Sequence, residues 1–196
     1  MAYHIYHTEG FIIGRKNIKE ADALLEVFTL DFGLLSVQAR SIRALTSKLR
    51  VHTICPGHLT LSLVKGGGGW RLVSAEETKL LGPVMTDFNK RQTASRVLKL
   101  LVRLMHGEGE NKNLYTTVKN GFIFMAESGG EDLSYRSLEC IMVLRILKSL
   151  GYLGDGPILE QFTNSHSWDK QLVGEMKTYE AQAIRAINAS FTAASL

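Results

Sequence analysis

One long stretch of the chain is basic and free of acidic residues. Between Phe32 and Ala75 the sequence contains no Asp or Glu. The basic residues of this stretch are Arg40, Arg43, Lys48, Arg50, Lys65 and Arg71. Phosphate groups are the commonest partners of such a surface, because each contact adds attraction and releases condensed counterions. The stretch therefore indicates nucleic-acid binding, and a solvated basic face is the alternative.

Catalytic and metal-binding patterns are not found in the sequence. Cys55 and Cys140 are far apart, and the histidines lack cysteine or carboxylate neighbours at ligand spacing. The run Gly66 to Gly69 is not followed by Lys-Ser or Lys-Thr, so it predicts a flexible hairpin loop and not a phosphate-binding P-loop. We expect no catalytic residue, no metal and no cofactor. A nuclease or other hydrolase would need a clustered acidic or metal-ligand motif.

The composition predicts a folded, mildly basic protein. Of 196 residues, 45% are hydrophobic and 21% are charged, and the net charge is +4. The basic excess lies mostly in residues 1–80, which carry ten Lys and Arg against seven Asp and Glu. No apolar run has membrane-spanning length, and the first residues do not resemble a signal peptide. We therefore expect a cytoplasmic location.

The N-terminal part is patterned as five short strands. We expect them at residues 3–13, 22–30, 34–41, 57–65 and 70–74. Five strands at hairpin-like spacing favour a small barrel, and the OB-fold is the commonest five-stranded one.

The third of these strands separates an apolar face from a polar face. Leu35, Val37 and Ala39 alternate with a polar set, which is Ser36, Gln38 and Arg40. Arg40 is therefore predicted to be exposed. Proteins that bind single strands combine such basic surfaces with aromatic stacking. The candidate aromatic residues are Tyr6, Phe28 and Trp70, and burial in the core is the alternative for each.

The rest of the chain is patterned as helices. Ser74 to Glu77 forms a capping box that predicts a short helix ending at Gly82-Pro83. Further helices are expected at 86–106, 112–127, 133–150 and 170–188, with a loop at 151–169. The predicted fold class is α+β multidomain: a five-stranded OB-fold barrel in residues 1–80, followed by an α-helical bundle in residues 81–196. One helical face carries Arg96, Lys99 and Arg103, a second basic patch.

Particular segments of the sequence resemble the RecO family of bacterial DNA repair and recombination mediators. The N-terminal resemblance rests on Glu9 to Ile13, Phe32 to Val37, Ala39 to Arg43 and Trp70 to Leu72. In the helical part, Leu144 to Leu153 resembles the family helix that ends in a Leu-Gly-Tyr-Leu turn. The resemblance is strongest over residues 5–80.

The resemblance implies a non-enzymatic protein that binds single- and double-stranded DNA and anneals complementary strands. It also implies help in loading RecA onto strands coated by the single-stranded-DNA-binding protein (SSB). RecR and the acidic, aromatic-ended SSB tail are the implied partners. The implied DNA-binding residues are Arg15, Lys16, Arg40, Arg43, Lys48 and Arg50, to which the basic stretch adds Lys65 and Arg71. The patch at Arg96, Lys99 and Arg103 is predicted from its helical face to contact DNA or the tail.

The chain departs from the family pattern in one place. Many relatives carry a four-cysteine zinc module after the Leu-Gly-Tyr-Leu turn, whereas residues 154–158 contain no cysteine. The zinc module is therefore absent here. The alternative function is a protein-interaction adaptor, in which the barrel and its basic surface bind acidic partner tails instead of DNA.

Overall fold

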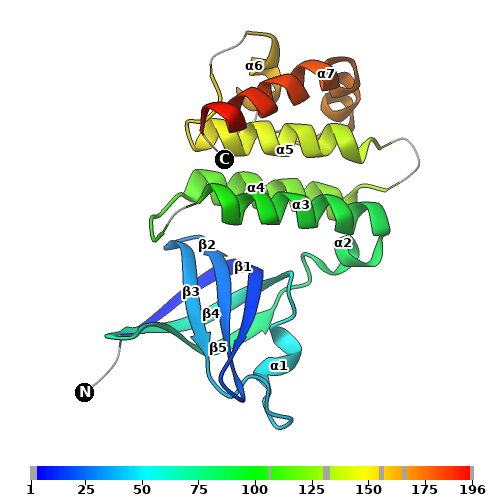
Figure 1. The fold of residues 1–196 in the computed structure, drawn as a ribbon. Helices are drawn as coiled ribbons and strands as arrows, with labels where there is room; N and C mark the ends of the chain where they lie inside the picture. Colours follow the sequence, from blue (N-terminus) through cyan, green and yellow to red (C-terminus); the bar gives the residue numbers. More distant parts are fainter. Residues whose placement is uncertain (1–3, 106, 130–132, 155–156, 165–166, 195–196) are drawn as a thin grey trace. The chain divides into compact units, whose positions relative to one another are not determined.

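The computed structural model describes residues 4–105, 107–129, 133–154, 157–164 and 167–194 (Figure 1). They form two compact units. The first, called the barrel unit, comprises the described parts of residues 1–81 and 105–112, and the second, called the helical unit, comprises those of 82–104 and 113–196. The sequence prediction of a single boundary near residue 80 did not include the return of 105–112 to the barrel. Residues 3 and 106, at the ends of two predicted elements, lie outside the described residues.

The barrel unit is a closed barrel of five strands. The strands are β1 (Ile5–Ile18), β2 (Asp22–Thr29), β3 (Gly33–Ala39), β4 (Gly57–Gly66) and β5 (Gly69–Glu77). Their order around the barrel is β1-β2-β3-β5-β4, and the short helix α1 (Leu49–His52) lies between β3 and β4 in the chain. All neighbouring pairs are antiparallel except β3 and β5, which pair in parallel. The predicted OB-fold class is confirmed.

Side-chain alternation around the barrel produces its core. On β3, Leu35, Val37 and Ala39 are buried, whereas Ser36 and the following Arg40 are exposed. The alternation is the one expected from the sequence, because successive side chains of a strand point to opposite faces. The core also takes in Leu25, Val27, Leu59, Leu61, Leu63 and Leu72.

The predicted helix beginning at Ser74 is wrong. Strand β5 runs on to Glu77 and stays paired with β4, with Ser74 opposite Ser62 and Glu77 opposite Leu59. The local capping signal is outweighed by cross-strand pairing, which satisfies the backbone of these residues along the ladder. The run of glycines does form the β4–β5 hairpin, since β4 ends at Gly66 and β5 begins at Gly69.

Residues 105 and 107–112, called the return segment, lie against the turn between β2 and β3. Glu108 forms an isolated bridge with Gly33, and the Gly109 amide donates to the Phe32 carbonyl at 3.3 Å. Gly33 has φ of +70°, and a Cβ there would collide with the Gly109 backbone. Only glycine meets both conditions, so the sequence at Gly33 permits the close approach of the return segment.

The helical unit is organised around α5. Its helices are α2 (Gly82–Thr86), α3 (Phe88–Leu104), α4 (Lys112–Glu127), α5 (Tyr135–Ser149), α6 (Pro157–Asn164) and α7 (Lys170–Ala193). Residues 141–147 of α5 are all buried, which is typical of a central helix surrounded by others. Helices α3, α6 and α7 each contact α5. Among the described residues, no helix combines the length and apolarity needed to cross a bilayer.

Two further predictions about the helical part are wrong. Gly82-Pro83, expected to stop a helix, begins α2, since proline is well suited to the first turn. The region 151–169, expected to be a loop, contains α6, whose Phe162 is fully buried. The packing of Phe162 and a hydrogen bond from Arg145 Nε to the Phe162 carbonyl, 2.8 Å long, hold α6 in place. Residues 155 and 156, which belong to the segment predicted to lack a zinc module, lie outside the described residues.

The β3–β4 connection should depend on one buried side chain. Ile42 is fully buried in the barrel core, whereas nearby Leu45 is 90% exposed. Replacing Ile42 by Ala should therefore lower the free energy of unfolding by about 2–5 kcal/mol, because a cavity is left in a closed core. Leu45→Ala is the matched control and should change it by less than about 0.5 kcal/mol. Urea unfolding measures both, and equal effects would contradict the assignment of Ile42 to the core.

Candidate nucleic-acid interface

The connection between β3 and β4, residues 40–56 and called the connector, is attached to the barrel at its start. The Ser41 amide donates to Asp22 Oδ1 at 2.8 Å, and the Arg43 amide donates to the Ala21 carbonyl at 2.9 Å. Ile42 between them is buried in the core. The backbone that carries Arg40 and Arg43 is therefore held against the β1–β2 turn. Its position does not depend on the side chains of Arg40 and Arg43 themselves.

The connector is attached again near its end. Thr53 is buried, its hydroxyl donates to the Leu49 carbonyl at 2.9 Å, and its own carbonyl accepts from Arg15 Nη1 at 3.3 Å. The side chains of Arg43, Lys48 and Arg50 are exposed along the connector between the two attachments. The connector thus displays three cations from a backbone that is held at both ends, and Arg15 of β1 lies beside it.

A small pocket, called the hairpin pocket, joins the end of β3 to the β4–β5 hairpin. Its lining includes Gln38, Arg40 and Arg71 together with the glycines 66–69 and Trp70, and its volume is about 190 Å³. The parallel register places Gln38 opposite Arg71, and Arg40 follows two residues after Gln38. Two guanidinium side chains and an amide therefore meet beside a loop without side chains, where a phosphate can approach the backbone closely.

Lys65 lies in a different environment because an acid of the return segment compensates its charge. Lys65 Nζ lies 2.7 Å from Glu108 Oε2, and Trp70 Nε1 donates to Glu108 Oε1 at 3.0 Å. Lys65 Nζ also lies 5.1 Å from the centre of the Trp70 ring. The hydrogen bond from Lys65 is the largest cause that lowers the pKa of the Glu108 carboxyl, and the indole hydrogen bond adds to it.

None of the three candidate stacking residues is an exposed ring. Trp70 is 5% exposed and belongs to the barrel core, whereas Phe28 is fully buried but is not part of that core cluster. Tyr6 is half-buried and meets Trp70 edge-on, with ring centres 5.2 Å apart. Phe32 completes the group at 5.1 Å from Trp70. The rings of Tyr6, Phe32 and Trp70 pack together beside Glu108 and do not form an open stacking platform.

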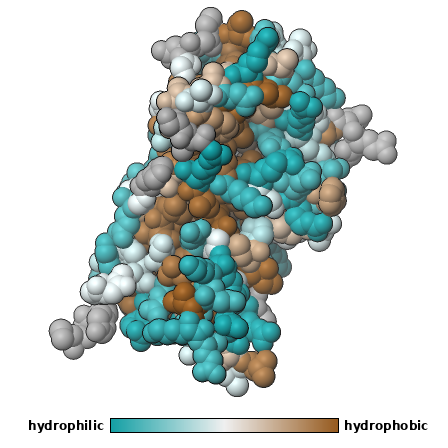
Figure 2. Space-filling model, in the orientation of Figure 1, coloured by the Kyte–Doolittle hydropathy of each residue, from teal (hydrophilic) through white to brown (hydrophobic). Residues whose placement is uncertain are grey.

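The structure thus brings some of the predicted DNA-binding residues together and separates others. Arg40 and Arg71 share the hairpin pocket, and Arg15 contacts the connector that carries Arg43, Lys48 and Arg50. Lys16 is exposed on β1. Lys65 is paired with Glu108, a residue that the sequence analysis missed because its contact spans 43 positions. The visible face of the barrel strands is mainly hydrophilic (Figure 2).

The second basic patch borders a groove in the helical unit. Arg96 of α3 makes a bidentate contact with Glu139 of α5, and Lys99 is exposed. Arg103 lies 6.0 Å from the centre of the Phe191 ring. The groove has a volume of about 520 Å³, and its lining is Arg96, Leu100, Arg136, Glu139, Cys140, Val143, Ile184, Ile187 and Phe191. It combines an apolar floor with basic side chains at its rim.

The two cysteines behave as small apolar side chains. Burial raises the pKa of the Cys55 thiol, and it raises that of Cys140 to about 11. Both thiols are therefore protonated at neutral pH, when they are weak nucleophiles and weak metal ligands. Within the described parts of the chain, no group of three His, Cys, Asp or Glu side chains is placed to hold a metal ion.

A closed five-stranded barrel with a basic connector between β3 and β4, followed by a helical unit, defines an OB-fold protein of two units. Comparison with known proteins gives the family. The family described as "Recombination protein O N terminal" matches residues 1–81. Residues 1–81 thus belong to the RecO N-terminal family.

Individual relatives match well beyond the barrel. A "DNA repair protein RecO" of Clostridium perfringens is 32% identical over 150 residues, which are 76% of this chain and 59% of the relative. One of the same name from Roseiflexus is 28% identical over 174 residues, which are 85% of this chain and 60% of the relative. The chain thus spans about three fifths of the length of these relatives.

The contact between Lys65 and Glu108 generates a titration prediction. A carboxylate pKa that is lowered by folding stabilises the fold at neutral pH, and this contribution is lost as the pH falls through the lowered value. Because both side chains are half exposed, the contribution is small. Replacing Lys65 by Met should raise the pKa of Glu108 towards its ordinary value, whereas Lys79→Met, a change at an exposed lysine, should not. The indole N–H resonance of Trp70, followed by NMR against pH, reports both. An unchanged midpoint in Lys65→Met would contradict the contact.

Proposed function

We propose that this protein is a DNA repair and recombination mediator that binds single- and double-stranded DNA and anneals complementary strands. The proposal includes help in loading RecA onto DNA coated by SSB, and it assigns no catalytic step to the protein. The name of its relatives, DNA repair protein, supports this function. The observation that carries it is the basic surface of the barrel unit, where Arg40 and Arg71 share a pocket beside the glycine hairpin.

The chemistry of that surface suits binding of a polyanion without sequence preference. Guanidinium groups bind phosphate oxygens in a bidentate manner, and the adjoining glycines present backbone to the strand. Gln38 adds an amide, whose Nε2 donates to Asp22 Oδ2 at 3.4 Å. The connector extends the positive surface through Arg43, Lys48 and Arg50, all exposed. No buried charge needs to be uncovered for phosphate to reach these side chains.

The proposed mechanism of annealing is charge screening. Two DNA strands repel each other because both are polyanions. A protein that neutralises phosphates on one strand lowers this repulsion and releases condensed counterions. The complementary strand then approaches, and base pairing supplies the specificity. The protein therefore needs exposed cations at fixed positions and needs no reactive group, which agrees with a connector held at both ends.

The groove of the helical unit supports a partner role. An acidic peptide that ends in an aromatic residue, as the SSB tail does, matches its apolar floor and its basic rim. Arg96 is already engaged by Glu139, so a peptide carboxylate would compete with Glu139 for that guanidinium. We extend the proposal to binding of this tail at the groove, with Lys99 and Arg103 close by on α3. RecR is the other proposed partner.

A protein-interaction adaptor is the rival function. In that case the barrel surface would bind acidic protein segments, and DNA affinity would be weak. The two functions differ in their salt dependence and in their response to charge reversal, since DNA binding loses about one unit of salt slope for each phosphate contact removed.

Charge reversal on the barrel tests DNA binding. The double variant Arg40→Glu/Arg43→Glu should weaken binding of a single-stranded oligonucleotide at least about tenfold and reduce the salt slope by about two, because two phosphate contacts are lost. Lys79→Glu/Lys177→Glu changes the net charge equally at exposed sites elsewhere and is the control. Fluorescence anisotropy at several salt concentrations measures both. Stability should hardly change, because exposed charges contribute little. Unchanged DNA binding with lost binding of an acidic peptide would favour the adaptor.

The groove is tested with two substitutions of opposite expected effect. Arg96→Gln should weaken binding of a synthetic acidic peptide ending in Phe by several-fold, because the guanidinium is removed. Glu139→Gln should strengthen it, because the competing carboxylate is removed. If the contact between Arg96 and Glu139 is purely structural, both changes should lower the melting temperature and leave the peptide affinity unchanged. Calorimetric titration and thermal unfolding distinguish these outcomes.

A further inference from the structure

A second pocket that is rich in hydrogen-bond donors lies in the helical unit, at the corner between α4, α5 and α6. Its volume is about 340 Å³. The lining side chains used here are Asn113 and Thr117 of α4, Arg145 and Lys148 of α5, and Thr163 and Asn164 of α6. Two are cations and four carry hydroxyl or amide groups, and none of the described residues that line the pocket carries a carboxylate. This combination suits an oxyanion with several acceptor oxygens.

Arg145 gives the pocket a cation whose position is set by the fold. The side chain is 5% exposed, and its guanidinium lies 4.1 Å from the centre of the Trp168 ring. Nε donates to the Phe162 carbonyl at 2.8 Å, and Nη2 donates to the Ser167 carbonyl at 3.0 Å. Both acceptors are neutral, so these contacts orient the charge, while the Asp169 carboxylate and the Trp168 ring favour it. Burial of the guanidinium is costly, and an anion in the pocket would offset part of that cost.

Arg145 keeps its charge at neutral pH. Burial is the largest cause that lowers its pKa, to about 10, and the carboxylate of Asp169, which caps α7, acts in the opposite direction. Asp169 does not line the pocket. The guanidinium is therefore protonated under physiological conditions, and no negative side chain is found in the described lining of the pocket.

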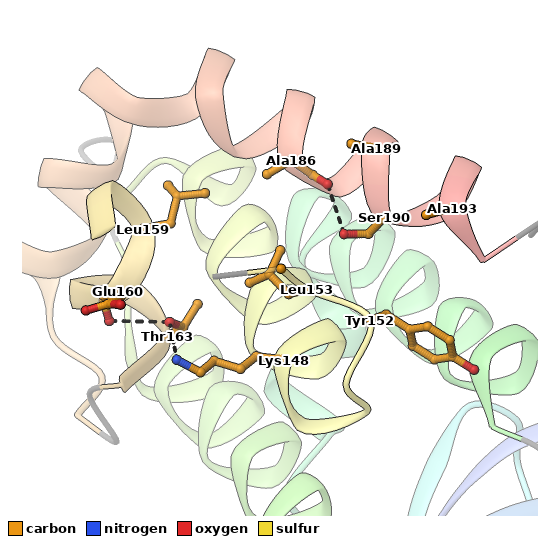
Figure 3. Close-up of a pocket in the computed structure, with 11 residues that line it drawn as sticks. Lys148, Tyr152, Leu153, Leu159, Glu160, Thr163, Ala186, Ala189, Ser190 and Ala193 are labelled. Carbon is orange, nitrogen blue, oxygen red and sulfur yellow. Dashed lines mark hydrogen bonds between the residues drawn. The ribbon is translucent and has the colours of Figure 1, made fainter. Parts of the chain in front are cut away.

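Lys148 adds the second cation at the same corner. Figure 3 shows its amino group reaching Thr163 of α6, at 3.3 Å from the hydroxyl oxygen. It also contacts Asn164 Oδ1. These acceptors are again neutral. Lys148 and Thr163 also line a neighbouring cleft of about 390 Å³, which extends along α7 and is the one drawn in Figure 3.

The start of α4 contributes a third favourable element. Asn113 is the second residue of α4, and Thr117 follows one turn later. The first turn of a helix of this length presents backbone N–H groups and the positive end of the helix dipole, which favours anions. Two side-chain cations, a helix start and several neutral donors therefore converge on one volume.

We propose that this pocket binds a phosphate group, supplied by a nucleic-acid strand, and gives the helical unit its own contact with DNA. The assignment of the phosphate to a nucleic acid rests on the proposed function, whereas phosphate binding itself does not. The site is separate from the basic surface of the barrel and from the groove at Arg96.

Inorganic phosphate is the probe for the pocket, added to the full chain at constant ionic strength. It should raise the melting temperature in a saturable way, and calorimetric titration should show saturable binding. Lys148→Gln and Asn113→Asp should each weaken this binding at least about tenfold, since a charged hydrogen bond is lost or a negative charge is added. Asn113→Asp places an acid in the first turn of α4, which favours helix formation, so its effect cannot be attributed to unfolding. Lys177→Gln, at an exposed lysine of α7, is the control.

The source of the phosphate is tested by competition. A single-stranded oligonucleotide should displace inorganic phosphate from the Arg40→Glu/Arg43→Glu variant, and Lys148→Gln should abolish that displacement. Phosphate binding that is equal in the original chain and in Asn113→Asp would overturn the site. Phosphate binding that no oligonucleotide displaces would overturn the nucleic-acid source. Failure of the barrel to bind DNA would overturn the proposed function and leave the inorganic phosphate result standing, so the two failures are distinguishable.

Discussion

The closure of the barrel by the short parallel pairing of β3 with β5 is the constraint on which the rest of the barrel unit depends. Val37 lies opposite Trp70 and Gln38 opposite Arg71, and these pairs join the two ends of the sheet. Once the sheet is closed, every strand has one inner face, and the polar side chains of all five strands must lie outside. The same pairs bring the end of β3 to the glycine hairpin, so closure and the hairpin pocket have one structural origin.

Positive charge is therefore displayed on a backbone that does not need it for folding. Ile42, Asp22 and Thr53 hold the connector, and the cations between them are exposed. In the helical unit the situation differs, because Arg145 and Lys148 also hold α6 in place through neutral acceptors. The cations of the connector are exposed on a backbone that is held by other groups, whereas Arg145 and Lys148 also take part in holding the fold.

Local pattern predicted much of the fold and less of the candidate site. The alternation in β3 and the helical periodicity before Leu104 lie within short windows of sequence, and the structure agrees with both. The helix predicted at Ser74 to Glu77 was wrong because a capping signal and a strand end share the same residues. Only the pairing with β4 decides between the two. Helix α6 was missed because its stability comes from Phe162 and Arg145, which lie 17 positions apart. The carboxylate beside Lys65 was missed for the same reason, at a larger separation.

Because of the return segment, no single cut in the polypeptide chain separates the two units. The chain leaves the barrel unit after residue 81, comes back at 105 and leaves again after 112. A fragment that ends at residue 81 would keep Lys65, Trp70 and Phe32 but would lose the carboxylate and the backbone that cover them. The same would hold for a chimaera in which only residues 1–81 were exchanged between relatives. Along this chain the barrel unit is thus built from two separate segments. The family match to residues 1–81 covers only the first of these segments.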